Sequence, residues 1–147
     1  MAKEKLIKYT RFALIVVGGM VFASLTAHAA GVKVIANSSV SASTISADDL
    51  KGVFLEEKSE LSDGTHVEPV LEKGGPAHDA FVKDYLGKTD SALQTYYRSL
   101  VFTGKGSMPK AMGTDAEVVA YVAKTKGAIG YVSADAAAEG VKTLEVK

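Results

Sequence analysis

The segment VKVIANSSVSASTISADDLKGVF (residues 32–54) contains a strand pattern followed directly by a helix pattern. Residues 32–37 are rich in β-branched side chains, which is typical of a strand. A serine-rich stretch, residues 38–43, follows and is expected to be a loop. Ser46-x-x-Asp49 then has the pattern of a helix start, and Leu50, Val53 and Phe54 continue it with the i, i+3, i+4 spacing of an apolar helix face. A strand followed by such a helix predicts a layered α/β domain.

The next part of the chain repeats this alternation once and then turns helical. Asp63-Gly64 marks a turn, and a second strand is expected at residues 66–71. Pro69 cannot donate a ladder hydrogen bond, so this strand is expected near an edge of the sheet. Pro76 is suited to the first position of a helix at residues 77–86, which Gly87 would end.

A third helix is expected from Thr89 to residue 101, with an apolar side made of Leu93, Tyr96, Tyr97, Leu100 and Val101. The glycine-containing stretch 103–113 is expected to be a loop. Thr114 and Glu117 have the spacing of a capping box for a fourth helix. Residues 128–132 and 141–146 are then expected to be strands, which gives the order β-α-β-α-α-α-β-β.

Length and composition limit the classes of protein that this chain can belong to. Its 147 residues are enough for one ordinary domain and argue against two. It contains no cysteine, which excludes disulfide bonds, a thiol nucleophile and a thiolate metal site.

The N-terminal residues have the three-part pattern of a secretory signal peptide, predicted here for residues 1–29. Residues 1–11 are basic, residues 12–23 (FALIVVGGMVFA) are apolar, and Ala27-His28-Ala29 places small residues before a cleavage site. The folded domain would then comprise residues 30–147 and reach a periplasm. The alternative is that the apolar segment is retained as a membrane anchor.

The charges are divided unevenly between these two parts. The chain has 17 basic and 17 acidic residues, but four basic residues and one acidic residue lie in residues 1–29. That segment carries +3, and the remainder carries −3, from 13 basic (17 − 4) and 16 acidic (17 − 1) residues. A mildly acidic domain is a poor candidate for binding nucleic acid.

No residue pattern predicts a metal site, a cofactor site or catalysis. Beyond His28, the histidines are His66 and His78, which are not spaced as a ligand pair. The G-x-S-x-G elbow of hydrolases is absent, and so is the complete phosphate-binding loop of nucleotide-binding proteins. The sequence therefore predicts no catalytic residue, and the protein is not expected to be an enzyme.

Two loops have the composition of anion sites. Asn37-Ser38-Ser39 follows the first strand, and Gly74-Gly75-Pro76-Ala77-His78 opens a helix. Backbone N–H groups at helix starts and serine hydroxyls can donate hydrogen bonds to an anion, and glycine lets it approach the backbone. Serine and glycine also form ordinary turns and caps, so a purely structural role is the alternative.

From residue 32 onward, the sequence resembles the substrate-binding proteins of phosphate ABC transporters. The similarity lies in the segments Val34-Ile35-Ala36-Asn37, Asp49-Leu50-Lys51-Gly52-Val53-Phe54-Leu55, Phe102-Thr103-Gly104-Lys105-Gly106 and Lys126-Gly127-Ala128-Ile129-Gly130-Tyr131-Val132. The resemblance implies an α/β fold: a single periplasmic-binding-protein-like lobe with a central mixed sheet flanked by helices. It implies a small single-domain member, because full phosphate-binding proteins have two lobes.

The resemblance also implies a function, a ligand site and partners. A small oxyanion such as phosphate would be bound, and a membrane permease or a periplasmic protein would be the partner of a monomer or homodimer. The candidate ligand-binding residues, drawn from the two loops described above together with Thr103, are Asn37, Ser38, Ser39, Gly74, Gly75, His78 and Thr103. The loop at residues 73–78 lacks the hydroxyls and the arginine of the full proteins. An accessory protein that keeps the fold without binding an anion is therefore the alternative.

Overall fold

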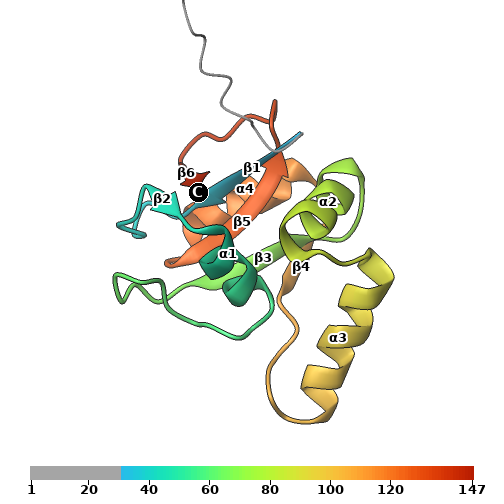
Figure 1. The fold of residues 1–147 in the computed structure, drawn as a ribbon. Coiled ribbons are helices and arrows are strands. Elements are labelled where there is room, and N and C mark those ends of the chain that lie inside the picture. Colours follow the sequence, from blue (N-terminus) through green and yellow to red (C-terminus); the bar gives the residue numbers. More distant parts are fainter. Residues whose placement is uncertain (1–30) are drawn as a thin grey trace, which may run out of the picture.

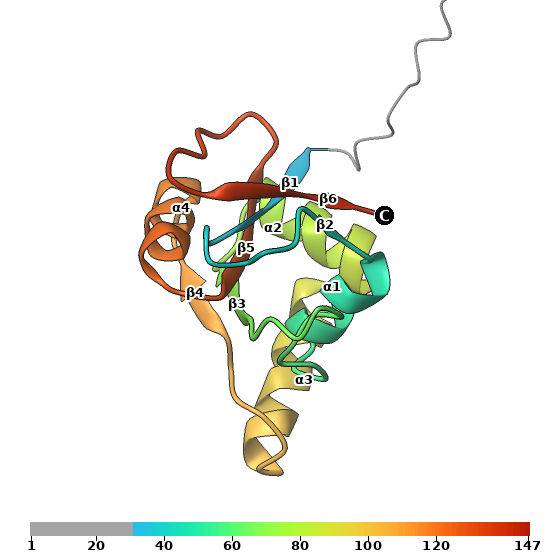
Figure 2. The same cartoon turned by 90° about the vertical axis from the view of Figure 1, so that its left-hand side faces the viewer.

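The computed structural model describes residues 31–147, so the predicted signal peptide lies outside the described residues. These residues form a six-stranded sheet with helices on both faces (Figures 1 and 2). The elements are β1 (Val32–Ala36), β2 (Thr44–Ile45), α1 (Ala47–Phe54), β3 (Glu68–Glu72), α2 (Pro76–Phe81), the π-helical turn η1 (Val82–Leu86), α3 (Asp90–Phe102), β4 (Lys110–Met112), α4 (Asp115–Lys124), β5 (Ala128–Ser133) and β6 (Lys142–Val146).

The sheet is mixed, as the fold prediction required. Its strand order is β2-β6-β1-β5-β3-β4. The central strand β1 is antiparallel to both of its neighbours, β5 and β6. The pairs β3–β5, β3–β4 and β2–β6 are parallel. The prediction of an α/β domain with a central mixed sheet flanked by helices is confirmed.

Alternate side chains of the strands fill a separate core on each face of the sheet. Val34 and Ala36 of β1 face the larger core beneath α1, α2 and α3, whereas Ile35 faces the smaller core beneath α4. Figure 2 shows α4 on one side of the sheet and α1 and α2 on the other. Successive side chains of a strand point to opposite faces of the sheet, so one short strand contributes side chains to both cores.

The predicted helix starts are confirmed by their cap hydrogen bonds. Ser46 Oγ accepts from the N–H of Asp49 at 3.0 Å, and Thr89 Oγ1 accepts from Ala92 at 3.2 Å. Thr114 Oγ1 accepts from Glu117 at 3.2 Å. Each cap satisfies an N–H group that the helix itself leaves unpaired, which is why these local patterns are informative.

The strand containing Pro69 lies near an edge of the sheet, as predicted. β3 lies between β5 and β4, and it is β4 that forms the edge. Pro69 is tolerated because N–H groups alternate sides along a strand. The N–H of Glu68 points to β5, so position 69 points to the β4 side, where pairing begins only at Val70. The missing N–H therefore breaks no ladder bond.

The sequence patterns predicted neither of two short strands. β2 is in the stretch that follows the serine-rich segment, and β4 is in the expected loop 103–113. They comprise two and three residues, so neither is long enough to show an alternating pattern. Only pairing with β6 and β3, respectively, gives them strand geometry.

The third helix differs from its prediction at its carboxyl end. Leu93 and Tyr97 are buried as expected, but Val101, assigned to the apolar side, is 53% exposed. Phe102 next to it is 93% exposed. Figure 1 shows why: the last turns of α3 project beyond the sheet and its covering helices, so this end has no partner to pack against.

Candidate functional site

Asn37 and Ser39, two of the predicted ligand residues, hold the loop after β1 against the end of α4. Asn37 is buried, and its Nδ2 donates to the carbonyls of Val122 at 2.7 Å and Ala123 at 3.1 Å. Its Oδ1 accepts from the N–H of Ser39, and Ser39 Oγ accepts from Gly127 at 3.0 Å. These polar atoms therefore satisfy backbone groups of the protein itself.

Replacing Asn37 by alanine is expected to lower the free energy of unfolding by about 2 kcal/mol, because buried carbonyls and an N–H group lose their partner. Urea denaturation would measure the change. Ser38 is exposed, so Ser38→Ala is the matched control and should change stability by less than about 0.5 kcal/mol. An Asn37→Ala protein as stable as the control would show that this hydrogen-bond network contributes nothing.

The two predicted loops lie at opposite ends of the sheet. β1 is antiparallel to β5, and the N–H of Asn37 donates to the carbonyl of Ala128 at the amino end of β5. β3 is parallel to β5, so the loop that follows β3 lies at the carboxyl end of both strands. A five-residue strand spans about 16 Å. Asn37–Ser39 and Gly74–His78 therefore cannot contact one small anion together.

His78 lies in a buried hydrogen-bond chain at this carboxyl end. Its side chain is fully buried, with Nδ1 2.5 Å from the hydroxyl of Tyr131 and Nε2 2.7 Å from Oδ1 of Asp90. The hydroxyl of Tyr131 also accepts from the N–H of Glu72 at 3.1 Å. One arrangement of protons satisfies every group: Tyr131 donates to Nδ1, and Nε2–H donates to Asp90. The imidazole thus joins α2, α3 and β5 and has no free nitrogen.

Glu72 and Asp115 form a carboxyl pair beside this chain. Glu72, the last residue of β3, is 5% exposed, and its burial, together with the neighbouring Asp115 carboxylate, raises its pKa to about 8. The pKa of Asp115 is lowered, mainly by the hydrogen bond from Glu72 and by the N–H of Ser133. At neutral pH the pair therefore holds one proton and one negative charge.

The Gly74–Gly75 loop between β3 and α2 is exposed. Among residues 31–147, the structure shows no acceptor for the N–H groups of Gly74, Gly75, Ala77 and His78. Gly75 has φ +102°, a left-handed conformation that favours glycine, and a Cβ at Gly74 would meet no atom within 4 Å. The loop thus presents backbone donors to open space.

The remaining predicted residues lie elsewhere. Ser38 is exposed at the opposite end of the sheet, beside Asn37. Thr103 is the C-cap of α3, where its hydroxyl donates to the carbonyl of Ser99 at 2.8 Å. The structure therefore divides the predicted residues into two separate groups, Asn37–Ser39 and Gly74–His78, and leaves Thr103 apart from both. It adds Glu72, Asp115 and Tyr131 to the surroundings of the second group. Local sequence patterns did not identify these three, since each meets its partners through strand pairing and helix packing.

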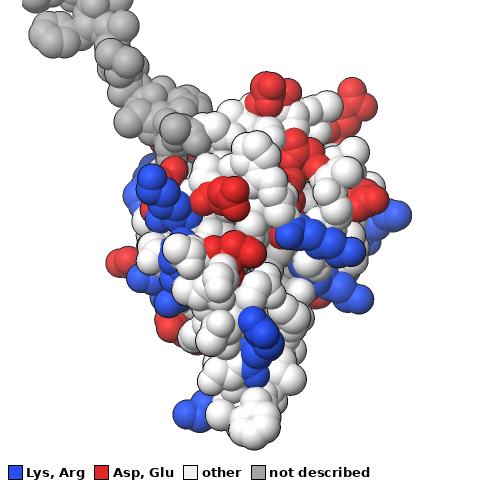
Figure 3. Space-filling model, turned by 90° about the vertical axis from the view of Figure 1, so that its right-hand side faces the viewer, with Lys and Arg blue, Asp and Glu red and all other residues white. Residues whose placement is uncertain are grey.

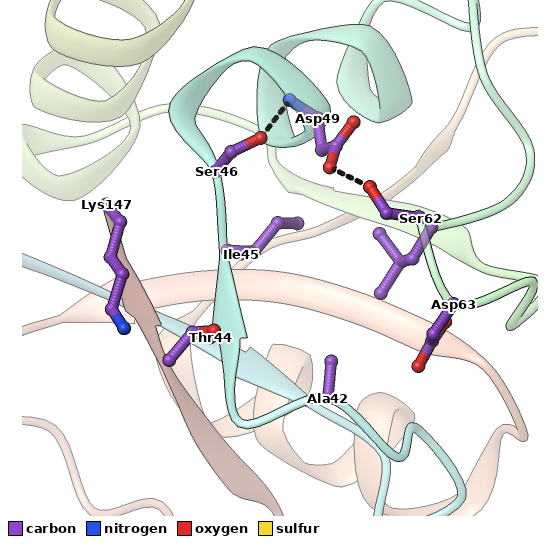
Figure 4. A pocket seen from close by; sticks show the side chains of 9 residues that line it. Ala42, Thr44, Ile45, Ser46, Asp49, Ser62, Asp63 and Lys147 are labelled. Atoms are coloured by element: carbon purple, nitrogen blue, oxygen red, sulfur yellow. Dashed lines mark hydrogen bonds between the residues drawn. The ribbon is translucent and has the colours of Figure 1, made fainter.

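The structure also contains a pocket of about 320 Å³ at the amino end of α1 (Figure 4). Asp49 and Asp63 line it, and Asp49 accepts from Lys58 at 2.6 Å and from Ser62 at 2.7 Å. The hydrogen bond from Lys58 lowers the pKa of Asp49, which keeps that carboxyl ionised. Lys147 also lines the pocket, and none of the predicted ligand residues does.

In residues 31–147, no three His, Asp or Glu side chains come together as a metal-binding group. None of the helices in the same range has the length and apolar composition needed to cross a bilayer.

The fold is similar to that of solved phosphate-binding proteins. An ABC-type phosphate transport receptor from Vibrio cholerae matches with a TM-score of 0.59 and 10% identity, over 79% of this chain and 46% of that one. The chain has a periplasmic-binding-protein-like fold. A phosphate ABC transporter substrate-binding protein from Clostridium perfringens, described as putative in its own name, was solved with bound phosphate. It matches with a TM-score of 0.60 and 15% identity, over 79% of this chain and 44% of that one. PstS from Borrelia burgdorferi matches with a TM-score of 0.58 and 13% identity, over 80% of this chain and 47% of that one.

These likenesses concern the fold and not membership of a family. The chain spans less than half the length of each of these three structures. No protein-family model matches it, and no curated protein is significantly similar to it.

Proposed function

We propose that this chain is an exported solute-binding protein that holds a small oxyanion such as phosphate at the Gly74–Gly75 loop. The observation that carries the proposal is the position of this loop. Its free N–H groups lie at the carboxyl ends of β3 and β5, in a fold shared with phosphate-binding proteins. Crevices at the carboxyl ends of parallel strands are where α/β proteins bind ligands.

The charges around the loop support binding of modest strength. Protonation of Glu72 at neutral pH removes one of the two negative charges of the carboxyl pair. Lys73, next to Gly74, is exposed and can approach an anion from solvent. Arg98, the only arginine after residue 29, lies on α3 and donates through Nε to the carbonyl of Gln94. Binding therefore rests on backbone donors without an arginine fork.

Calorimetric titration of phosphate into the protein tests this proposal. We expect saturable heat for the natural sequence, and Gly74→Asp should weaken binding about tenfold or more by placing a carboxylate in the loop. Ser43→Asp adds the same charge at an exposed position before β2, four strands from β3, and should leave the affinity unchanged.

Ser38→Asp distinguishes the two ends of the sheet. If Ser38→Asp abolishes binding and Gly74→Asp does not, the anion lies at the Asn37–Ser39 loop, and the site proposed here is wrong. A folded protein that gives no heat at millimolar phosphate or sulfate would contradict anion binding as such.

The second candidate function is that of an accessory protein that keeps the fold without an anion site and binds a permease or another exported protein. The internal use of Asn37 and His78 favours it, since the N–H groups of these two side chains already donate within the protein. The same titration separates the two functions, because an accessory protein of this kind would give no heat with any oxyanion.

A further inference from the structure

The projecting end of α3 and the loop that returns from it expose apolar side chains. Val101 is 53% exposed, Phe102 is 93% exposed and Met108 is 49% exposed. Large apolar side chains are exposed in this way only here within residues 31–147. We call residues 91–113, which comprise most of α3 and this loop, the α3 arm.

The charges of the α3 arm differ from those of the rest of the domain. Residues 91–113 contain Arg98, Lys105 and Lys110, all exposed, and no aspartate or glutamate. The rest of residues 31–147 has 10 basic (13 − 3) and 16 acidic residues, a net charge of −6. Figure 3 shows a lower projection that is white and blue, with the red groups above it. Three carboxyl-bearing residues from outside the arm lie beside it. Glu117 Oε2 accepts from the N–H of Gly113 at 2.7 Å and Asp90 Oδ1 accepts from Gln94 at 3.5 Å, at the two ends of the arm, and the half-buried Glu56 lies beside Gly106.

The apolar area of the arm is small for a protein interface. Three partly exposed side chains present roughly 400 Å², whereas a specific protein interface covers about 800 Å² on each partner. An aromatic side chain at a protruding tip with cations around it fits a lipid interface better. There the apolar groups enter the acyl boundary and the cations contact anionic headgroups.

We propose that the α3 arm binds an anionic lipid surface, with Phe102 inserted and Arg98, Lys105 and Lys110 against the headgroups. The excess negative charge of the rest of the domain would keep that part away from the bilayer, so only the arm makes contact. Binding of this kind is weak and reversible, because the arm inserts few apolar groups.

Flotation with phosphatidylglycerol-rich vesicles tests the proposal. The assay uses a chain that starts at Ala30, after the predicted signal peptide, so that the apolar N-terminal segment does not itself bind the vesicles. A single cooperative urea transition of this chain is the check that it folds. Phe102→Asp should lower partitioning about tenfold or more. The double variant Lys105→Glu and Lys110→Glu should lower it at least twentyfold, since each cation near such a surface contributes about a fivefold change.

Matched controls lie on α4 and the turn after it. Ala120→Asp adds a charge at an exposed position, and Lys124→Glu with Lys126→Glu reverses two exposed cations. Both should change partitioning less than about twofold if only the arm touches the bilayer. The proposal would be overturned if the control variants lost as much partitioning as the arm variants. It would also be overturned if the natural protein bound phosphatidylcholine vesicles as well as phosphatidylglycerol-rich ones.

A fluorescent reporter gives a direct measurement. The chain has no tryptophan, so Phe102→Trp introduces a single indole at the tip. We expect a blue shift of its emission on adding phosphatidylglycerol-rich vesicles. An unshifted spectrum would contradict the lipid proposal. Retention on an immobilised polyglutamate peptide without vesicle binding would also contradict it and would assign the arm to an acidic protein partner.

Discussion

Replacing Phe81 by alanine is expected to lower the free energy of unfolding by about 3–5 kcal/mol. Phe81 is fully buried at the centre of an aromatic group in the larger core. Its ring stacks on Tyr131 with centroids 3.9 Å apart and meets the edge of Phe54 at 4.7 Å. The substitution removes this burial and leaves a cavity between rigid rings that cannot collapse to fill it.

The matched control for this experiment is Phe102→Ala. It deletes the same side chain at a position that is 93% exposed, so it should change stability by less than about 0.5 kcal/mol. Urea denaturation of both variants would measure the difference in the free energy of unfolding. Similar losses for Phe81→Ala and Phe102→Ala would contradict the packing of α2 against β5 described here.

Replacing Glu72 by glutamine is expected to remove a pH dependence of stability worth at most about 5 kcal/mol, since each unit of pKa difference between the folded and unfolded states corresponds to about 1.4 kcal/mol. Burial beside Asp115 raises the pKa of Glu72 from 4.5 to about 8 in the folded protein. Between these two values the folded state holds a proton that the unfolded state has released. The contribution of Glu72 to the free energy of unfolding is therefore fully present below pH 4.5, and it is lost as the pH rises to about 8.

Glutamine cannot ionise, and its amide can still donate to Asp115. The free energies of unfolding of the natural protein and Glu72→Gln should therefore be similar near pH 5 and diverge by pH 9, with the variant the more stable. Glu145→Gln, an exposed change of the same kind, should show no such divergence. Parallel stability curves for Glu72→Gln and the natural protein would show that Glu72 ionises normally.

The helix boundaries could be predicted from the sequence because each depends on a few adjacent residues. Ser46, Thr89 and Thr114 satisfy N–H groups three positions ahead, and Gly87 has the left-handed φ of +64° that ends a helix. Such interactions need no distant partner. The strands of five or six residues were predictable for the same reason, since alternation or β-branched composition is visible within each segment.

The candidate site could be predicted only in part. Gly74 and Gly75 form an open loop with free N–H groups, as their residue types suggested. Asn37 and Ser39 have the same polar character in the sequence, yet their side chains satisfy backbone groups 85 and 88 residues away. A local pattern shows that a side chain can donate or accept, but the tertiary structure determines which groups are already satisfied.

The sequence by itself determined an α/β layering, three helix caps and the glycine loop, because these follow from neighbouring residues and from the period of apolar side chains. Only the tertiary structure decided that the two polar loops lie at opposite ends of the sheet, since this depends on β1 running antiparallel to β5. It also decided that the end of α3 projects unpacked. An apolar residue is buried only where another element covers it, and no element covers Phe102.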